Sequence, residues 1–251
     1  MSGILVNLIS SAIWLILGVL TARAVYRLRV VRPARNLWQI ADIKGLIIVA
    51  SHATTTHTGE YARPATGIGN IRALASVVES LNKAYGKLTV RNIYLSTDQL
   101  QDRLENDLLL LGGPKNNKIS AHFLGLIKGC QPLVEVNQRF YWRTHSGRGW
   151  NEKGAQEFHG KVENDQVIKD FGIGVRMISP FTSEKRTVIL IAGSHTYGVV
   201  AAAKYLTEQI HKDLPFRRLK ESNLVFVVSA DIMDQHPINI RLEKYYTWKS
   251  E

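Results

Sequence analysis

Residues Glu105–Asn117 read ENDLLLLGGPKNN, and this stretch gives the clearest indication of the fold. The apolar run Asp107–Leu111 is typical of a strand that is buried on both faces, as in parallel sheets. The two glycines that follow allow a sharp turn and the close approach of a ligand to the backbone. Asn116 or Asn117 can then cap a helix at about Ile119–Lys128. Free N–H groups and the helix dipole converge at such a corner, so it suits an anion.

The same plan recurs at Thr187–Gly198. Leu109–Phe123 and Leu190–Leu206 both run from an apolar strand through glycine and a polar turn into a helix. Taken alone, Gly112-Gly113-Pro114 is equally consistent with a tight turn that binds nothing. The repetition of the plan favours a binding role for these corners.

The sequence has 251 residues, a formal net charge of +11 and an isoelectric point near 9.8. A chain of this length can bury one large core or two small ones. A basic surface suits anionic partners such as phospholipid, nucleic acid or phosphorylated small molecules. The single cysteine, Cys130, excludes an internal disulfide and a cysteine-based zinc site, and it fits a reducing compartment.

The first 22 residues carry no charged side chain. At about 1.5 Å per residue, about 20 residues cross the hydrocarbon layer of a membrane. Five arginines follow with no acid among them: Arg23, Arg27, Arg29, Arg32 and Arg35. Because positive flanks stay in the cytoplasm, we predict a single-pass protein of a bacterial inner membrane, with a cytoplasmic C-terminal domain.

A cleaved signal peptide ending near Ala22-Arg23-Ala24 is the alternative. The basic cluster follows the apolar run and none precedes it, which favours an anchor. We therefore expect residues 1–32 to form the transmembrane helix and a basic juxtamembrane segment, and residues 33–251 to form the cytosolic domain. The helix should stop at Arg32-Pro33, because the residue before a proline disfavours helical conformation.

Small and polar residues recur at helical spacing along the apolar segment: Gly3, Asn7, Ser11, Gly18 and Ala22. In lipid, such a face lets helices approach closely and form hydrogen bonds. We therefore expect a homo-oligomer, although a helix can also carry small residues by chance.

Strand and helix patterns alternate in the rest of the chain. The predicted strands are Gly45–Ala50, Asn92–Ser96, Asp107–Leu111, Thr187–Ala192 and Leu224–Ser229, and the longer predicted helices are Gly67–Tyr85 and Tyr197–His211. This alternation predicts an α/β fold, a Rossmann-like, mostly parallel sheet with helices on both faces. Short runs broken by glycines predict a β-rich insertion at about residues 130–180, and Ile238–Tyr246 should form a last, antiparallel strand.

Three turns at the expected carboxyl ends of strands carry hydroxyls, glycine amides and a guanidinium. Ligands of doubly wound sheets bind outside these strand ends, where the strand order reverses. Such groups suit phosphate or ribose oxygens, so the expected small anionic ligand is a nucleotide or another phosphorylated small molecule. The predicted ligand-binding residues are Ser51, Thr54, Thr58, Arg63, Thr66, Gly67, Gly69 and Asn70 in the first turn, Gly112, Gly113, Asn116 and Asn117 in the second, and Gly193, Ser194, His195 and Thr196 in the third.

None of these turns is a fingerprint. Thr66–Asn70 lacks the full dinucleotide-binding spacing, and no Walker loop is present. The first loop, Ser51–Thr66, is also consistent with a surface loop whose threonines only turn the chain. Glu60 is the only acid in this loop, so it is the candidate general base or ribose ligand, and the catalytic residues are otherwise unknown.

The sequence does not favour two other ligand classes, metals and nucleic acids. His52, His57 and His195 could meet at the sheet edge and bind a metal, but scattered histidines more often bond to the backbone or face solvent. The aromatic and basic run Arg139–Arg143 could stack on nucleic acid. Such a run is more often a hairpin with alternating faces.

The two corners together resemble a known type of domain. The first corner has the pattern strand-Gly-Gly-Pro-x-x-Asn (Leu109–Asn117), and the second has strand-Ala-Gly, a polar turn and Ala-Ala-x-x-Leu (Ile191–Leu206). This pair of patterns is similar to Rossmann-like prokaryotic domains, including parts of archaeal surface-layer-like proteins. More distantly, it resembles the nucleotide-recognising Rossmannoid domains of the SLOG and TIR kind. In bacteria these are often fused to membrane helices in nucleotide-signalling or antiviral systems.

The resemblance covers roughly residues 45–129 and 187–230. The chain lacks the triple glycine and the later Pro-Gly-Gly-x-Gly-Thr of SLOG domains, and it has no identifiable catalytic glutamate on a TIR-like motif. Catalytic residues are therefore not carried over from either family.

The expectation from sequence is a membrane-anchored cytosolic sensor or effector that binds a nucleotide and assembles on binding. One alternative is a membrane-tethered nucleotide hydrolase or glycosidase that uses the same cleft, with Glu60 or a histidine as base. The other is a non-catalytic scaffold that presents its basic surface to a partner protein.

Overall fold

The four leucines of β5 (Leu108–Leu111) lie in the middle of the central sheet, and all four side chains are buried. β5 pairs in parallel with β1 (Ile47–Ala50) on one side and with β11 (Thr187–Gly193) on the other. β1 pairs in parallel with β4 (Ile93–Leu95) at the edge of the sheet. These four strands form the parallel core that the apolar runs predict.

The structure is a computed structural model that describes residues 2–57, 59, 61–86, 92–146, 149–215, 219 and 223–249. Within these residues the central sheet has eight strands, in the order β13-β12-β10-β11-β5-β1-β4, with β9 beside β10. The strands outside the parallel core are antiparallel to their neighbours: β9 (Lys161–Glu163), β10 (Gln166–Ile178), β12 (Asn223–Met233) and β13 (His236–Trp248). The prediction of a last antiparallel strand is confirmed.

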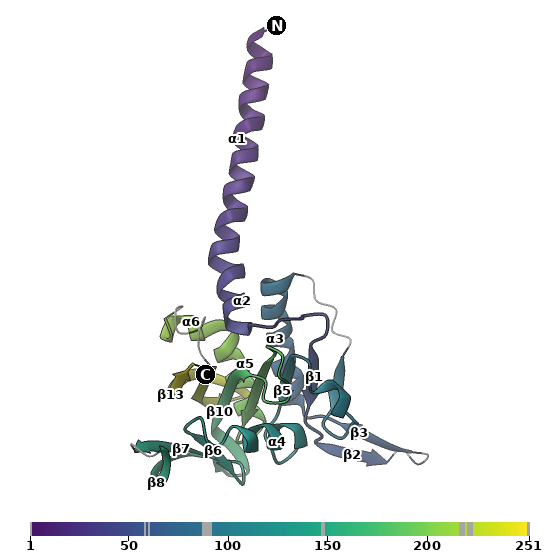
Figure 1. Ribbon diagram of the computed structural model, residues 1–251, viewed down its shortest axis with the longest axis vertical. Helices are drawn as coiled ribbons and strands as arrows, with labels where there is room; N and C mark the ends of the chain where they lie inside the picture. The colour runs from purple at the N-terminus through teal and green to yellow at the C-terminus, as the bar shows by residue number, and fades with distance from the viewer. Residues whose placement is uncertain are drawn as a thin grey trace.

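Helices cover both faces of the sheet (Figure 1). One face carries α2 (Arg32–Trp38), α3 (Ile68–Tyr85) and α5 (Thr196–Lys204), which continues through a π-helical segment, η3 (Tyr205–Gln209), into α6 (Ile210–Asp213). The other face carries α4 (Lys118–Leu126) and a three-stranded sheet of β6 (Leu133–Val136), β7 (Arg139–Ser146) and β8 (Gly149–Phe158). A 3-10 turn, η2 (Gln101–Arg103), precedes β5.

Alternation along β5 divides the interior into two cores. Leu109 and Leu111 face the core under α2, α3 and α5, whereas Leu108 and Leu110 face the core under α4 and the small sheet. Successive side chains of a strand point to opposite faces, so a strand with apolar residues on both faces must be covered on both. The predicted mixed α/β fold with helices on both faces is confirmed.

The stretch at 130–180 differs from the predicted insertion. β6, β7 and β8 form their own sheet, but β10 belongs to the central sheet, between β11 and β12. The glycines Gly172 and Gly174 of β10 suggest a broken run in the sequence. In the fold they allow close packing, because a Cβ at Gly172 would collide with the Gly198 carbonyl and one at Gly174 with the Phe226 ring.

The N-terminal helix does not stop at Pro33, contrary to the prediction from Arg32-Pro33. α1 (Ser2–Tyr26) passes through a π-helical segment, η1 (Arg27–Val31), directly into α2. The proline lies in the first turn of α2, where its missing N–H is tolerated, and the wider π turn carries the chain past its ring. The helix ends only at Gln39, which adopts a left-handed conformation (φ 49°).

The helix from Asn7 to Trp38 is long and apolar enough to cross a membrane. Its membrane-length apolar part is exposed and projects away from the domain (Figure 1), whereas Leu37 and Trp38 at its other end are buried in the domain core. The side chains change from exposed to buried near Ala34.

Candidate functional site

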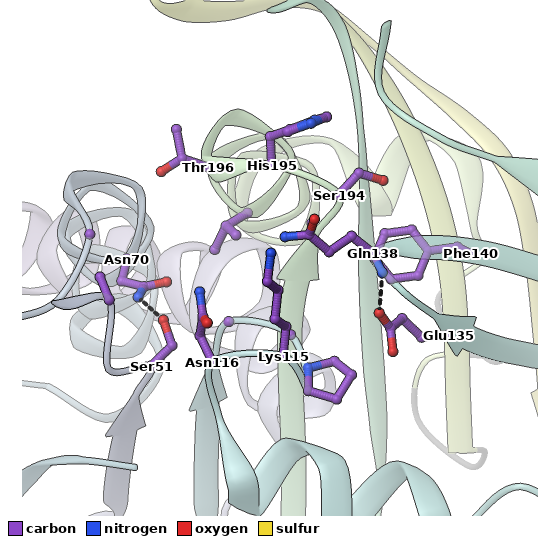
Figure 2. Close-up of a pocket in the computed structure, with 17 residues that line it drawn as sticks. Ser51, Asn70, Lys115, Asn116, Glu135, Gln138, Phe140, Ser194, His195 and Thr196 are labelled. Carbon is purple, nitrogen blue, oxygen red and sulfur yellow. Dashed lines mark hydrogen bonds between the residues drawn. The ribbon is translucent and has the colours of Figure 1, made fainter. Parts of the chain in front are cut away.

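A cavity of about 240 Å³ opens at the carboxyl ends of β1, β5 and β11. From β1 the chain passes through α3 to β4, which pairs with one edge of β1. The next strands, β5 and β11, lie on the opposite edge of β1, so the strand order reverses between β1 and β5. Loops diverge at such a point and leave a crevice, where open α/β sheets bind ligands. Figure 2 shows Ser51, Asn70 and Asn116 on one side of the cavity, His195 and Thr196 at its top, and Gln138 and Phe140 opposite.

All three predicted turns contribute to this cavity. Ten of the residues predicted from the sequence line the cavity: Ser51, Gly67, Asn70, Gly112, Gly113, Asn116, Gly193, Ser194, His195 and Thr196. Turns separated by more than 140 positions in the chain therefore meet in one place.

Five of the predicted residues that the structure describes lie outside the cavity wall: Thr54, Arg63, Gly69, Thr66 and Asn117. Thr54 and Arg63 are exposed on a hairpin of β2 (Thr54–His57) and β3 (Ala62–Ala65), which forms in place of the predicted loop. Gly69 is buried in α3, where a Cβ would collide with Thr196.

The fourth, Thr66, accepts a hydrogen bond from Asn70 (Nδ2 to Oγ1, 2.8 Å) and so supports the wall from behind. Thr58 and Glu60 lie outside the described residues. The guanidinium expected from Arg63 is thus not part of the cavity wall, because pairing of β2 with β3 holds this arginine on an exposed strand.

Ser51 and Asn70 join the two ends of the first turn, and Ser51 also packs against the second turn at Gly112. Asn70 Nδ2 donates to Ser51 Oγ at 2.6 Å, and both side chains are buried. Gly112 has a φ of 97°, and a Cβ there would lie 2.7 Å from both the Cβ and the Oγ of Ser51. Only glycine permits this backbone conformation and this close approach together.

Asn117 is a structural cap. Its Oδ1 accepts from the N–H groups of Ile119 and Ser120 at 3.1 Å, and its Nδ2 donates to the carbonyls of Val49 and Leu111 at 3.2 Å. The start of α4 is therefore satisfied by the protein itself, as expected for an asparagine N-cap. Asn117 is fully buried and unavailable to a ligand.

The first turns of α3 and α5 border the cavity through Gly67 and His195, their N-cap residues, and neither residue caps its helix with a side chain. α5 is capped instead from β10, because the buried carboxylate of Asp170 accepts from the N–H groups of Gly198 (2.5 Å) and His195 (3.1 Å). The start of α3 has no such carboxylate among the described residues. It therefore offers the partial positive charge of a helix N-terminus to the cavity.

His195 is held by the same aspartate. Its Nδ1 lies 3.3 Å from Asp170 Oδ1, and this hydrogen bond raises the pKa of the imidazole, while nearby Lys115 acts in the opposite direction. Gly160 backs the ring closely, since a Cβ there would collide with Nδ1. The ring of His159 lies beside it, with centroids 5.9 Å apart. His195 thus keeps its positive charge to higher pH than an ordinary histidine.

Lys115 is the main cation that the sequence reasoning left out. It stands at the tip of the second turn, lines the cavity, and forms no ion pair with any described residue. The sequence does contain a signal for this role, because Lys115 directly follows Gly112-Gly113-Pro114 and a cation beside a glycine turn is suited to binding an anion. Pro114, Ala53 and Val199 complete this side of the wall.

A second wall comes from the β6–β7 hairpin, which the sequence did not connect with the site. Glu135, Gln138 and Phe140 line the cavity opposite the three turns. Asn137 and Gln138 form the tight turn, with φ of 52° and 68°, and the Gln138 N–H donates to Glu135 Oε1 at 2.6 Å. Burial raises the pKa of the Glu135 carboxyl. This contact depends on packing between two separate sheets, which leaves no local pattern in the sequence.

Among the described residues, no group of three histidine, cysteine, aspartate or glutamate side chains could hold a metal ion. His52 Nε2 is 2.9 Å from Thr55 Oγ1, and His57 is exposed on the β2–β3 hairpin. Neither lines the cavity with His195.

Comparison with known proteins leaves the family open, because no protein-family model and no curated protein matches the chain.

Proposed function

We propose that this chain is a membrane-anchored binding protein for a small anionic ligand, a nucleotide or another phosphorylated small molecule. The observation that carries the proposal is the convergence of three glycine-containing turns with Lys115 and His195 at the point where the strand order reverses. The carboxylate that contacts His195, that of Asp170, is buried and accepts three backbone N–H groups in addition to the histidine.

The charge on the three-turn wall favours an anion. The Lys115 ammonium, the His195 imidazolium and the start of α3 are all positive or partly positive and border one small space. A hydrogen bond between a charged donor and phosphate contributes about 1.5–3 kcal/mol when it is sheltered from solvent.

Ser194 adds an independent reason for a ligand here. The side chain is buried, lines the cavity, and its Oγ has no hydrogen-bond partner among the described residues. A buried hydroxyl left unpaired costs free energy, so such groups are normally satisfied by protein, water or ligand.

The cavity lies at the end of the domain opposite the N-terminal helix. The chain that follows α2 reaches the amino ends of the strands, where Asp107 Oδ2 accepts from Ala41 and Asp42 and its Oδ1 accepts from Thr187. In Figure 1, α1 leaves at the top, whereas α4 and the β2–β3 hairpin, which follow the carboxyl ends of β5 and β1, lie at the bottom. The ligand would thus arrive from the aqueous phase, the cytoplasm if the arginines after α1 determine the topology.

In this proposal the protein is a sensor or effector in nucleotide signalling or antiviral defence, and ligand binding changes how the membrane helices assemble. The direct connection of the span to the domain core supports such coupling. Arg176, a buried residue of β10, donates to the carbonyls of Asn36 (3.1 Å) and Leu37 (2.8 Å) in the last turn of α2. The same strand carries Asp170 at its cavity end.

The test is calorimetry on the full chain in detergent with ADP and pyrophosphate as probes. Lys115→Met should weaken both about tenfold, since it removes one partly exposed charge from the binding wall. Lys244→Met, an exposed lysine on β13 outside the cavity, is the matched control and should change nothing. Binding of neither probe to the wild type would overturn the proposal and favour a scaffold.

A second candidate, a nucleotide hydrolase or glycosidase, is favoured by the Asp170–His195 pair. A carboxylate that orients an imidazole by one nitrogen leaves the other nitrogen to exchange a proton with a substrate. The same calorimetry samples can be assayed for release of phosphate or base. An enzyme would turn over ADP and lose that turnover in His195→Asn, whereas a sensor gives no turnover in the wild type.

A further inference from the structure

The cavity between the three turns continues into a second hollow. This hollow has a volume of about 360 Å³ and is lined by Pro114, Lys115, Glu135, Asn137 and Gln138. Four of its lining residues, all except Asn137, also line the first cavity. The two spaces therefore adjoin at Lys115 and the β6–β7 turn, and a ligand with two ends can occupy both.

The two facing walls of this continuous site differ in charge. The three-turn side carries Lys115, His195 and the start of α3, whereas the β6–β7 side carries the carboxylate of Glu135 and the neutral amides of Asn137 and Gln138. A carboxylate repels phosphate but accepts hydrogen bonds from hydroxyl groups. A ligand that is anionic along its whole length is thus disfavoured.

Glu135 has acceptor capacity left for such a bond. Its Oε1 accepts from the Gln138 N–H at 2.6 Å, which fixes the side chain against the turn. Within the described part of the chain, Oε2 accepts no hydrogen bond, and no cation forms an ion pair with the carboxylate. A half-buried carboxylate oxygen at a cavity wall, held by its own turn, is a built acceptor.

The wall that presents Glu135 is anchored by packing and by its turn geometry. Phe140 is buried in the second core beside Phe158, and the positive φ values of Asn137 and Gln138 restrict the turn to a narrow geometry. Preorganised acceptors bind with little loss of side-chain freedom.

Resting on the proposed function, we propose that the ligand carries a vicinal diol, as ribose does, on the side of the molecule away from its phosphate, and that Glu135 recognises this diol. The chemistry is shared by nucleotides and free sugar phosphates. Inorganic phosphates and polyphosphates lack the second end and would occupy only the three-turn side.

Four probes separate these possibilities on the full chain in detergent: ADP, 2′,3′-dideoxy-ADP, ribose 5-phosphate and pyrophosphate. The wild type should bind ADP about 10- to 100-fold more tightly than the dideoxy form, because a hydrogen bond to a charged group is lost. In Glu135→Gln this ratio should approach one, with pyrophosphate binding unchanged or tighter. Glu157→Gln, on the exposed face of β8 outside both hollows, should keep the wild-type ratio.

Ribose 5-phosphate identifies the source of the diol. If ribose 5-phosphate binds as tightly as ADP, the natural ligand is a sugar phosphate. If ribose 5-phosphate binds much more weakly than ADP, while ADP still binds more tightly than its dideoxy form, the natural ligand is a nucleotide. Equal affinity of the wild type for ADP, its dideoxy form and pyrophosphate would overturn the diol proposal while leaving anion binding in place. Absence of binding by all four probes would overturn both.

Discussion

Asp170 shows how one buried residue organises the cavity. It caps α5, orients His195 and lies on β10, whose other end reaches the base of the N-terminal helix. A fully buried carboxylate is stable in the charged form only when donors surround it, and here backbone N–H groups and an imidazole do so. The raised pKa of His195 is the consequence at the cavity surface.

Anion binding should depend on pH through His195. The pKa of its folded form is raised by Asp170, so the imidazolium and its attraction for phosphate are fully present below the ordinary histidine pKa and are lost as pH rises through the raised one. Any folding free energy that the Asp170–His195 pair contributes is likewise lost as pH rises through the raised pKa of His195. Asp170 favours the charged ring, whereas Lys115 opposes it, and His159 lies beside it.

Pyrophosphate affinity measured between about pH 5 and pH 9 should therefore show a decline above the ordinary histidine pKa. His195→Gln should remove this step and lower the affinity at acidic pH. His236→Gln, at the exposed start of β13, is the control. A step of unchanged size in His195→Gln would assign it to another group.

At the scale of elements, the amino ends of the strands form the joint between the helix and the sheet. Asp107 is buried and receives N–H groups from Ala41, Asp42 and Thr187 at 2.7–3.0 Å. It thereby ties the segment after α2 and the start of β11 to β5. Asp107 thus has a structural role, and it lies at the end of the sheet opposite the cavity.

Asp107→Asn should destabilise the domain by about 1.5–3 kcal/mol, because one acceptor oxygen becomes an NH₂ group that faces N–H donors. Urea unfolding of the full chain followed by tryptophan fluorescence measures this change. Asp102→Asn, on the exposed turn η2, should stay within about 0.5 kcal/mol of the wild type. ADP affinity should be nearly unchanged in both, since neither residue lines the cavity.

The elements that the sequence predicted well have strong local signals. Four consecutive leucines are typical of a strand buried on both faces, and an asparagine before a helix caps it, as Asn117 does. The meeting of the three turns followed from one rule, that parallel strands bring their carboxyl ends to the same edge. β10 was missed because its glycines suggest a break, although they are needed where α5 and Phe226 pack.

Features that depend on distant packing were not predictable in this way. The β6–β7 wall faces the turns across the cavity, from a different sheet, and no periodicity in the sequence reports such an arrangement. Arg63 was selected as the only arginine in its loop, yet strand pairing with Thr56 holds it outside the cavity wall. The β-branched run Thr54-Thr55-Thr56 was the signal for that hairpin.

For the whole molecule, topology is the first property to test. The uncharged first 22 residues and the arginines after them predict that a reporter fused to the C-terminus behaves as cytoplasmic. Mass spectrometry of the purified protein should find the N-terminal segment intact. A periplasmic reporter signal or a new N-terminus near Ala24 would contradict the anchored topology.

The absence of a break at Pro33 has a geometric consequence for any assembly of these chains. Because α1, η1 and α2 form one continuous helix whose end is buried in the domain, the direction in which the cavity faces is set by an angle around the helix axis. Each residue of an α-helix advances that angle by about 100°. One residue inserted between Arg23 and Arg32 would therefore swing the domain more than a quarter turn around the span, whereas seven would nearly restore its heading. The length of the continuous helix therefore sets the direction in which each domain faces. Insertions or deletions in this helix alone can change how neighbouring domains face one another.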